Sequence, residues 1–90
     1  MHIEEIEKFL DKQKLAKGQQ VKIDFRKRNT LYGMFIKTDD YGELKSKNLW
    51  RIVVEPRIKE YLASKDLNLA RIFNGVEITR LGVVAATAAA

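Results

Sequence analysis

Arg26, Lys27 and Arg28 form a run of three cations between two apolar stretches of the chain. Guanidinium and ammonium groups contact phosphates, so this run can hold a nucleic-acid backbone, although such runs are more often solvated turns. The chain carries 17 Lys and Arg against 12 Asp and Glu, a formal net charge of +5, and Lys45 and Lys47 add to the excess in its middle part. We therefore predict a phosphate-contacting surface that includes these five cations.

Residues that could support catalysis or metal binding are scarce. Cysteine is absent and the one histidine is His2, which leaves no Ser-His-Asp set, no Cys-His pair and no histidine-based zinc site. Asp39 and Asp40 are adjacent carboxylates without a visible partner, a pattern typical of a turn. The five glycines are too scattered for a phosphate loop. We predict a non-enzymatic protein without a metal, a cofactor or a small-molecule substrate.

The hydrophobic pattern predicts the elements that position these residues, beginning with a helix. Ile3, Ile6, Phe9 and Leu10 recur at helical spacing with charged residues between them. Acidic residues occupy the first turns and basic residues the last, which suits the helix dipole. The sequence therefore predicts a helix over residues 3–16 whose apolar stripe docks on the rest of the domain.

Strands are predicted next. The alternating stretch QQVKIDF indicates a half-buried strand, and TLYGMFIK indicates a second one in which both faces are at least partly covered. LWRIVV indicates a third strand, with Trp50 in the core or an interface, and residues 44–46 are expected to form a short strand before it.

The pattern then changes twice. EPRIKEYLASKD has helical spacing and predicts a helix over residues 56–65. LARIFNGVEITRL returns to strand character and is interrupted by Asn74-Gly75, which is either a tight hairpin turn or a kinked strand corner.

Together these elements predict a mainly β fold with an N-terminal helix and a small bent-sheet barrel, into which a short helix is inserted near residues 56–65. We expect a single domain over residues 1–84, with the barrel at 20–81, and a disordered alanine-rich tail at 85–90. No apolar run approaches the length of a membrane span, and the N-terminus lacks the layout of a secretory signal, so we expect a cytoplasmic protein.

The stretch GMFIKTDDYGEL resembles the first motif of the Sm-like family, which includes Hfq. In that motif a glycine is followed by an apolar residue, an aspartate and an aromatic residue, and Gly33, Phe35, Asp39 and Tyr41 stand at the matching spacings. The stretch IFNGVEI resembles the second motif, with Gly75 in place.

The resemblance implies an Sm-like or SH3-like barrel that binds RNA and assembles into a homo-oligomeric ring. Gly33 and Gly75 would permit sharp bends, Asp39 would fix the loop backbone, and Tyr41 would stack on a base. Asn74 would lie at the second RNA-contacting corner. The nucleic-acid-binding residues expected in this way are Arg26, Lys27, Arg28, Tyr41, Lys45, Lys47 and Asn74.

Two positions depart from the family pattern. Glu43 stands where the family has an RNA-contacting asparagine, and a carboxylate there repels phosphate. Asn74 replaces the usual arginine and so removes a cation. We therefore expect RNA binding with little sequence specificity.

A protein-interaction module without any nucleic-acid role is the alternative. In that case the barrel edge, or the face formed by Tyr32, Met34 and Ile36, would bind a partner protein or a second copy of the chain.

Overall fold

The structure is a computed structural model that describes residues 1–13 and 19–84. The elements in chain order are α1 (Ile3–Gln13), β1 (Val21–Phe25), β2 (Leu31–Phe35), α2 (Tyr41–Ser46), β3 (Leu49–Val54), α3 (Ile58–Ser64), the 3-10 turn η1 (Leu67–Leu69), β4 (Arg71–Asn74), the 3-10 turn η2 (Gly75–Glu77) and β5 (Ile78–Val83). The predicted alanine-rich tail at 85–90 and the end of the predicted helix at 14–16 lie outside the described residues.

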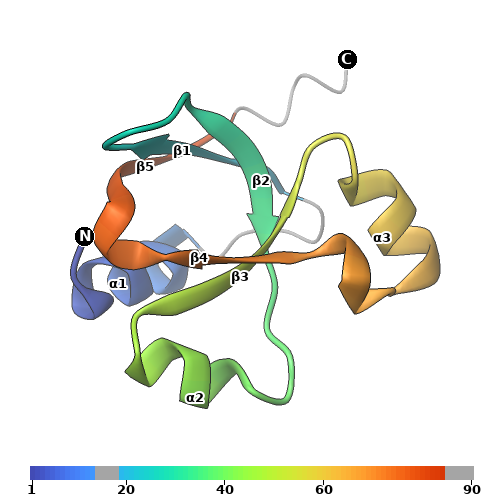
Figure 1. Ribbon diagram of the computed structural model, residues 1–90, viewed down its shortest axis with the longest axis horizontal. Coiled ribbons are helices and arrows are strands. Elements are labelled where there is room, and N and C mark those ends of the chain that lie inside the picture. Colours follow the sequence, from blue (N-terminus) through green and yellow to red (C-terminus); the bar gives the residue numbers. More distant parts are fainter. Residues whose placement is uncertain (14–18, 85–90) are drawn as a thin grey trace.

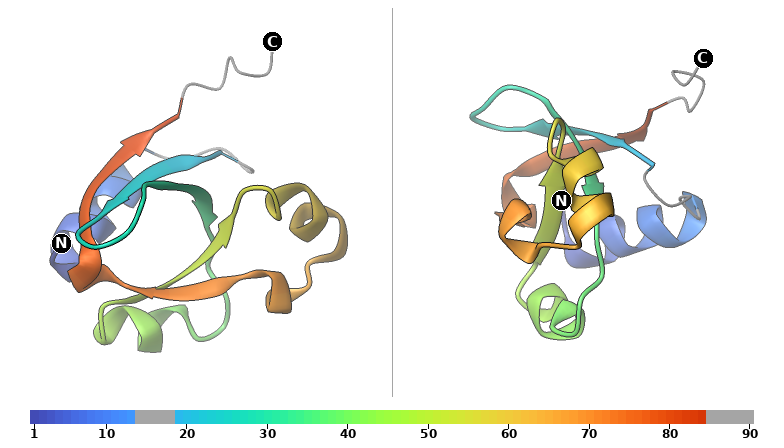
Figure 2. Two further views of the ribbon diagram at one scale, coloured as in Figure 1. Left: turned by 45° about the horizontal axis from the view of Figure 1, so that its top comes forward. Right: turned by 90° about the vertical axis from the view of Figure 1, so that its right-hand side faces the viewer.

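The five strands form one antiparallel sheet in the order β4-β3-β2-β1-β5. The sheet bends so that β1 and β5 face β3 and β4 across the interior, while α1 and α3 lie at opposite ends of the molecule (Figure 1 and Figure 2). The prediction of a mainly β fold with an N-terminal helix and a small bent-sheet barrel is confirmed.

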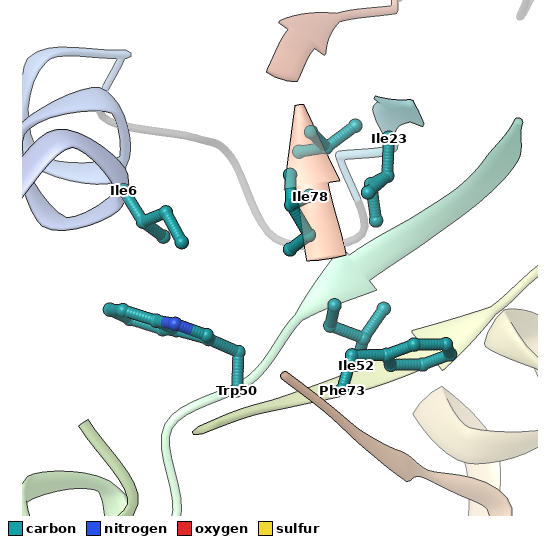
Figure 3. Close-up of a cluster of buried hydrophobic side chains, with 7 residues drawn as sticks. Ile6, Ile23, Trp50, Ile52, Phe73 and Ile78 are labelled. Carbon is teal, nitrogen blue, oxygen red and sulfur yellow. The ribbon is translucent and has the colours of Figure 1, made fainter. Parts of the chain in front are cut away.

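The interior is filled by side chains from the helix and from four of the strands. Trp50 of β3 is 1% exposed, and Ile6 reaches from α1 toward its ring (Figure 3). Phe73 and Ile78 approach the same cluster from either side of η2. Trp50 is therefore a core residue, and α1 docks on the barrel through the apolar stripe that its spacing predicted.

A smaller apolar cluster lies on the outer face of the sheet, beneath α3. Met34, Val53 and Ile58 are its buried members, and Ile36 packs against it. Met34 and Ile36, two of the three residues of the face expected to bind a partner, are thus covered by other parts of the same chain. Tyr32, the third, is 40% exposed. The helix predicted near residues 56–65 is confirmed as α3.

Gly33 allows β2 and β3 to lie close together. A Cβ atom added there would stand 2.7 Å from Cγ2 of Ile52 and 3.0 Å from the carbonyl oxygen of Val53. The position therefore requires glycine for close approach between two paired strands.

The short strand expected at residues 44–46 is wrong, because this segment belongs to the helix α2. Helical backbone bonds form here, with the Leu44 N–H donating to the Asp40 carbonyl at 3.0 Å. The helical turn lets the Tyr41 ring pack edge-on against Trp50 and brings Lys45 to Glu7 of α1. Tertiary contacts, rather than β propensity, decide the conformation of this segment.

Asn74-Gly75 is a kinked corner and not a hairpin, since β4 pairs with β3 whereas β5 pairs with β1. The Asn74 side chain accepts a hydrogen bond from the Val76 N–H at 2.9 Å, and the Gly75 N–H donates to the Asn48 carbonyl at 2.8 Å. A Cβ atom on Gly75 would stand 2.7 Å from Cγ of Asn48 and 2.8 Å from Cδ1 of Ile6. Glycine is required here because the corner is packed against both α1 and the start of β3.

Within residues 1–13 and 19–84, none of the helices has the length and apolar character needed to cross a bilayer.

Candidate nucleic-acid interface

A groove of about 330 Å³ lies between the β1–β2 loop and the corner that joins β4 to β5. We call it the corner groove. Phe25, Ile72 and Phe73 supply its apolar surface, and Lys27, Arg28, Asn74 and Glu77 supply its polar surface. It combines residues from both halves of the chain, because the bend of the sheet brings the first loop to the last corner.

The apolar surface of the groove is built from two aromatic rings and one exposed aliphatic side chain. The Phe25 and Phe73 rings lie 5.6 Å apart at a tilt of 37°. Phe73 is 6% exposed and anchors the pair in the core, whereas Ile72 on the other face of β4 is 48% exposed. A fixed aromatic pair beside an accessible apolar side chain can receive the flat face of a ligand.

Four cations surround this surface. The Arg28 guanidinium lies 5.5 Å from the Phe25 ring centre and 5.7 Å from that of Phe73, and Arg71 lies 5.4 Å from the Phe73 ring centre. Arg26 donates through Nε to the Val76 carbonyl at 3.2 Å, and Lys27 is exposed. Within the described part of the chain, none of the four forms an ion pair. Their charges are therefore available to an anion.

Two polar side chains complete the groove. Asn74 has its Oδ1 occupied by the Val76 N–H, which leaves the amide NH₂ to donate elsewhere. Glu77 is exposed and is the one carboxylate among the residues that line the groove. The Val76 N–H holds the Asn74 side chain, and the backbone of Glu77 is held because its carbonyl accepts the Arg26 N–H at 3.0 Å.

The remaining residues that the sequence predicted as nucleic-acid contacts lie on α2 or, for Lys47, at its C-terminal end, outside the groove lining. Tyr41 is half-buried; its ring packs on Trp50 at 6.1 Å, with the ammonium groups of Lys37 and Lys45 at 5.1 and 5.6 Å from its centre. Burial raises the pKa of Tyr41 above its ordinary value of 10.0. Its ring is thus engaged within the chain rather than open to a base.

The cations of α2 are paired. Lys45 forms an ion pair and hydrogen bond with Glu7 of α1, and that hydrogen bond raises the pKa of Lys45 above its ordinary value of 10.5. The ammonium group of Lys47, the residue that follows α2, lies 3.8 Å from the Glu43 carboxylate, one turn earlier. Neither is as available to phosphate as the cations of the corner groove.

Asp39 does not hold the loop before α2, and this expectation is corrected. Asp39 is exposed, whereas Asp40 accepts hydrogen bonds from the Thr38 hydroxyl and, at 2.6 Å, from Nη2 of Arg51. The Thr38 hydrogen bond, helped by the Arg51 guanidinium and opposed by partial desolvation, lowers the pKa of Asp40 below its ordinary value of 3.8. The hydrogen bonds of this loop are thus made by Asp40, the second aspartate of the pair, and not by Asp39.

The structure therefore brings together Arg26, Lys27, Arg28 and Asn74, and it places Tyr41, Lys45 and Lys47 in a separate region. Sequence reasoning missed Phe25, Ile72, Arg71 and Glu77 as groove residues. The alternation of the first strand put Phe25 on a buried face, and only the bend of the sheet, which brings β1 opposite β4, reveals that Phe25 meets Phe73 at the groove.

No group of His, Asp and Glu side chains suited to a metal ion is found among residues 1–13 and 19–84. Comparisons of the chain with protein-family models, with curated proteins and with solved structures found no match.

Proposed function

We propose that this protein binds single-stranded nucleic acid, RNA in particular, through the corner groove and without catalysis. One observation carries the proposal: four cations that have no carboxylate partner among residues 1–13 and 19–84 surround an apolar, partly aromatic groove. Phosphates need the cations and bases need the apolar surface, and single-stranded nucleic acid offers both groups at once.

The energetics favour a flexible single strand over a duplex. The groove is small, and in a duplex the flat faces of the bases are hidden by stacking. An unstacked base can instead enter the groove and contact Ile72 and the Arg28 guanidinium. Base stacking is worth about 1–3 kcal/mol for each base, and phosphate contacts add a salt-dependent attraction.

The resemblance to the Sm-like family supports RNA over DNA. The barrel strand order and the glycine corner are compatible with that resemblance, although the cations that support binding lie mainly in the β1–β2 loop.

The test is a fluorescence-anisotropy titration of the whole chain with a labelled single-stranded RNA of about eight nucleotides. Affinity should fall steeply between about 50 mM and about 200 mM salt, with a slope near 0.7 for each phosphate contacted. Single-stranded DNA of the same sequence should bind less tightly, and an RNA duplex less tightly still. Absence of any binding at the lower salt concentration would overturn the proposal.

A second candidate, binding of a protein partner, is favoured by the two edges of the sheet. In the described residues β4 and β5 each pair on one side alone, and Ile72, Val76 and Val83 are 48%, 53% and 44% exposed along this part of the chain. The partner we propose is a second copy, whose β5 would pair with β4 and extend the sheet toward a ring. Light scattering at high protein concentration tests this, and a strict monomer would remove the ring while leaving RNA binding untouched.

A further inference from the structure

We propose that the corner groove selects a guanine base, and that the Glu77 carboxylate recognises it. This inference rests on the proposed function and adds to it the identity of the preferred base. The sequence alone predicted little specificity, because Glu43 was expected to face the RNA. Glu43 instead lies on α2 in an ion pair with Lys47, and the carboxylate that faces the groove is Glu77.

Glu77 is held firmly by its backbone and is free at its side chain. It ends η2, its carbonyl accepts the Arg26 N–H at 3.0 Å, and the next residue, Ile78, is fully buried. In the described part of the chain its carboxylate makes no hydrogen bond or ion pair. A free carboxylate carried on a fixed backbone at the wall of the groove can accept hydrogen bonds from a ligand.

A carboxylate works against phosphate binding unless it contacts something other than phosphate. It stands among Arg28, Lys27 and Arg26, so it lowers the positive potential that the strand would meet. Its two oxygens accept hydrogen bonds and cannot donate them. The part of a nucleotide that matches it is therefore a base edge with donors.

Guanine is the base that matches a carboxylate best. Its N1–H and N2–H donate side by side, so both carboxylate oxygens are used in a bidentate pair. Adenine and cytosine place an acceptor nitrogen beside their one amino group, and uracil places a carbonyl on each side of its N3–H. In these three bases the acceptor faces a carboxylate oxygen and repels it.

Asn74 and Arg28 complement the same base. Because Oδ1 of Asn74 is held by the Val76 N–H, its NH₂ group remains to donate to the guanine O6, which adjoins N1. Arg28 supplies a planar cation beside the Phe25 and Phe73 rings, on which a purine can stack. The groove volume of about 330 Å³ is sufficient for one base.

The experiment compares four RNAs of about eight nucleotides, each oligouridine with guanine, inosine, adenine or uracil at one central position. We expect the guanine RNA to bind about 10-fold more tightly than the uracil RNA, and inosine, which lacks the N2 amino group, to lose most of that preference.

Glu77→Gln is the decisive variant, with Glu4→Gln on the exposed face of α1 as a control that removes the same charge elsewhere. Glu77→Gln should abolish the preference for guanine, while oligouridine binds as well as before or slightly better because a negative charge is gone. Glu4→Gln should keep the full preference.

The possible outcomes separate the two proposals. If wild type binds all four RNAs equally and with a steep salt dependence, the guanine inference is overturned and RNA binding stands. If guanine is preferred and Glu77→Gln retains that preference, Glu77 is not the residue that recognises it, and the inference is again overturned. If no RNA binds at low salt, RNA binding itself fails. A preference that disappears with Glu77→Gln alone supports the inference.

Discussion

The corner groove and the α2 region contain similar residue types, basic side chains beside an aromatic ring, but differ in what those side chains contact. On α2, Lys45 pairs with Glu7 and Lys47 with Glu43. At the groove, Lys27 and Arg28 have no carboxylate partner in the described residues and lie beside an open apolar surface. Both regions contain cations, but those at α2 are neutralised by carboxylates, so the charge available to a ligand is concentrated at the corner groove.

The aromatic rings show the same contrast. Tyr41 lies against Trp50 and helps attach α2 to the barrel, so its role is structural. Phe25 and Phe73 turn one side to the core and the other to the groove, where Arg28 covers them. The rings hold the Arg28 guanidinium by contacts worth about 0.5–1 kcal/mol at an exposed site, so that a base can stack on the guanidinium.

The largest difference in stability between variants of the two regions is expected when their glycines are replaced by alanine. Gly75→Ala should lower the free energy of unfolding by about 3 kcal/mol, because its Cβ would clash with Asn48 and Ile6. Gly42→Ala in α2 meets nothing within 4 Å and should raise stability by up to about 1 kcal/mol, since alanine favours a helix. Urea denaturation of both variants measures this, and equal stabilities would contradict the packing described at the corner.

The second test removes cations from each region. Replacing Arg26, Lys27 and Arg28 together by Ala should weaken RNA binding about 30-fold, roughly 2 kcal/mol, and reduce the salt slope by up to about two units. Replacing Lys45 and Lys47 by Ala should change affinity by less than about threefold. Anisotropy titrations at two salt concentrations compare them. If replacing Lys45 and Lys47 weakened RNA binding more than replacing the three cations of the β1–β2 loop, the interface would lie at α2 and not at the corner groove.

The third test concerns the loop that leads into α2. Because the pKa of Asp40 is lowered in the folded state, its ionised form stabilises the fold above its ordinary pKa of 3.8, and this contribution disappears as the pH falls through the lower folded value. Asp40→Asn should therefore melt at a lower temperature than wild type at neutral pH, with the gap closing in acid. Asp39→Asn, which changes an exposed side chain, should melt like wild type throughout. If Asp39→Asn melted below wild type and Asp40→Asn did not, Asp39 would be the residue that fixes the loop, as the sequence predicted.

The smallest effect is expected from an exposed cation of α2. Lys47 is 64% exposed and its pair with Glu43 spans 3.8 Å, so Lys47→Ala should change stability by less than about 0.5 kcal/mol. Calorimetry checks this, with RNA affinity expected to remain unchanged. A clear loss of affinity would show that RNA reaches beyond the corner groove onto α2.

Most of the fold could be predicted because its signals are local. Alternation in the first strand and the i, i+3, i+4 spacing in both longer helices correspond to β1, α1 and α3. The six-residue α2 was missed because its conformation depends on Trp50 and Glu7, which contact it only in the folded chain. The choice between hairpin and corner at Asn74-Gly75 likewise depended on strand partners that local sequence does not specify.

The candidate site was predicted in part for a related reason. The run at Arg26 was visible because its three cations are adjacent in sequence. Ile72 and Glu77 were missed, although Asn74 between them was predicted, because the β1–β2 loop that completes the groove comes from the other half of the chain. Lys45 was selected on charge alone, and charge does not reveal that Glu7 neutralises it.

The pairing of β1 with β5 has a consequence for how the protein is made. Val21 and Ile23 of β1 are fully buried, yet one of the two strands that flank them, β5, is among the last described segments to be synthesised. A growing chain can assemble β1, β2 and β3 in order as they emerge, but its interior stays open until Ile78 arrives. Closure of the interior during synthesis therefore waits for one long-range step, and a ribosome that stalls before β5 emerges leaves one edge of β1 as an uncovered template for aggregation.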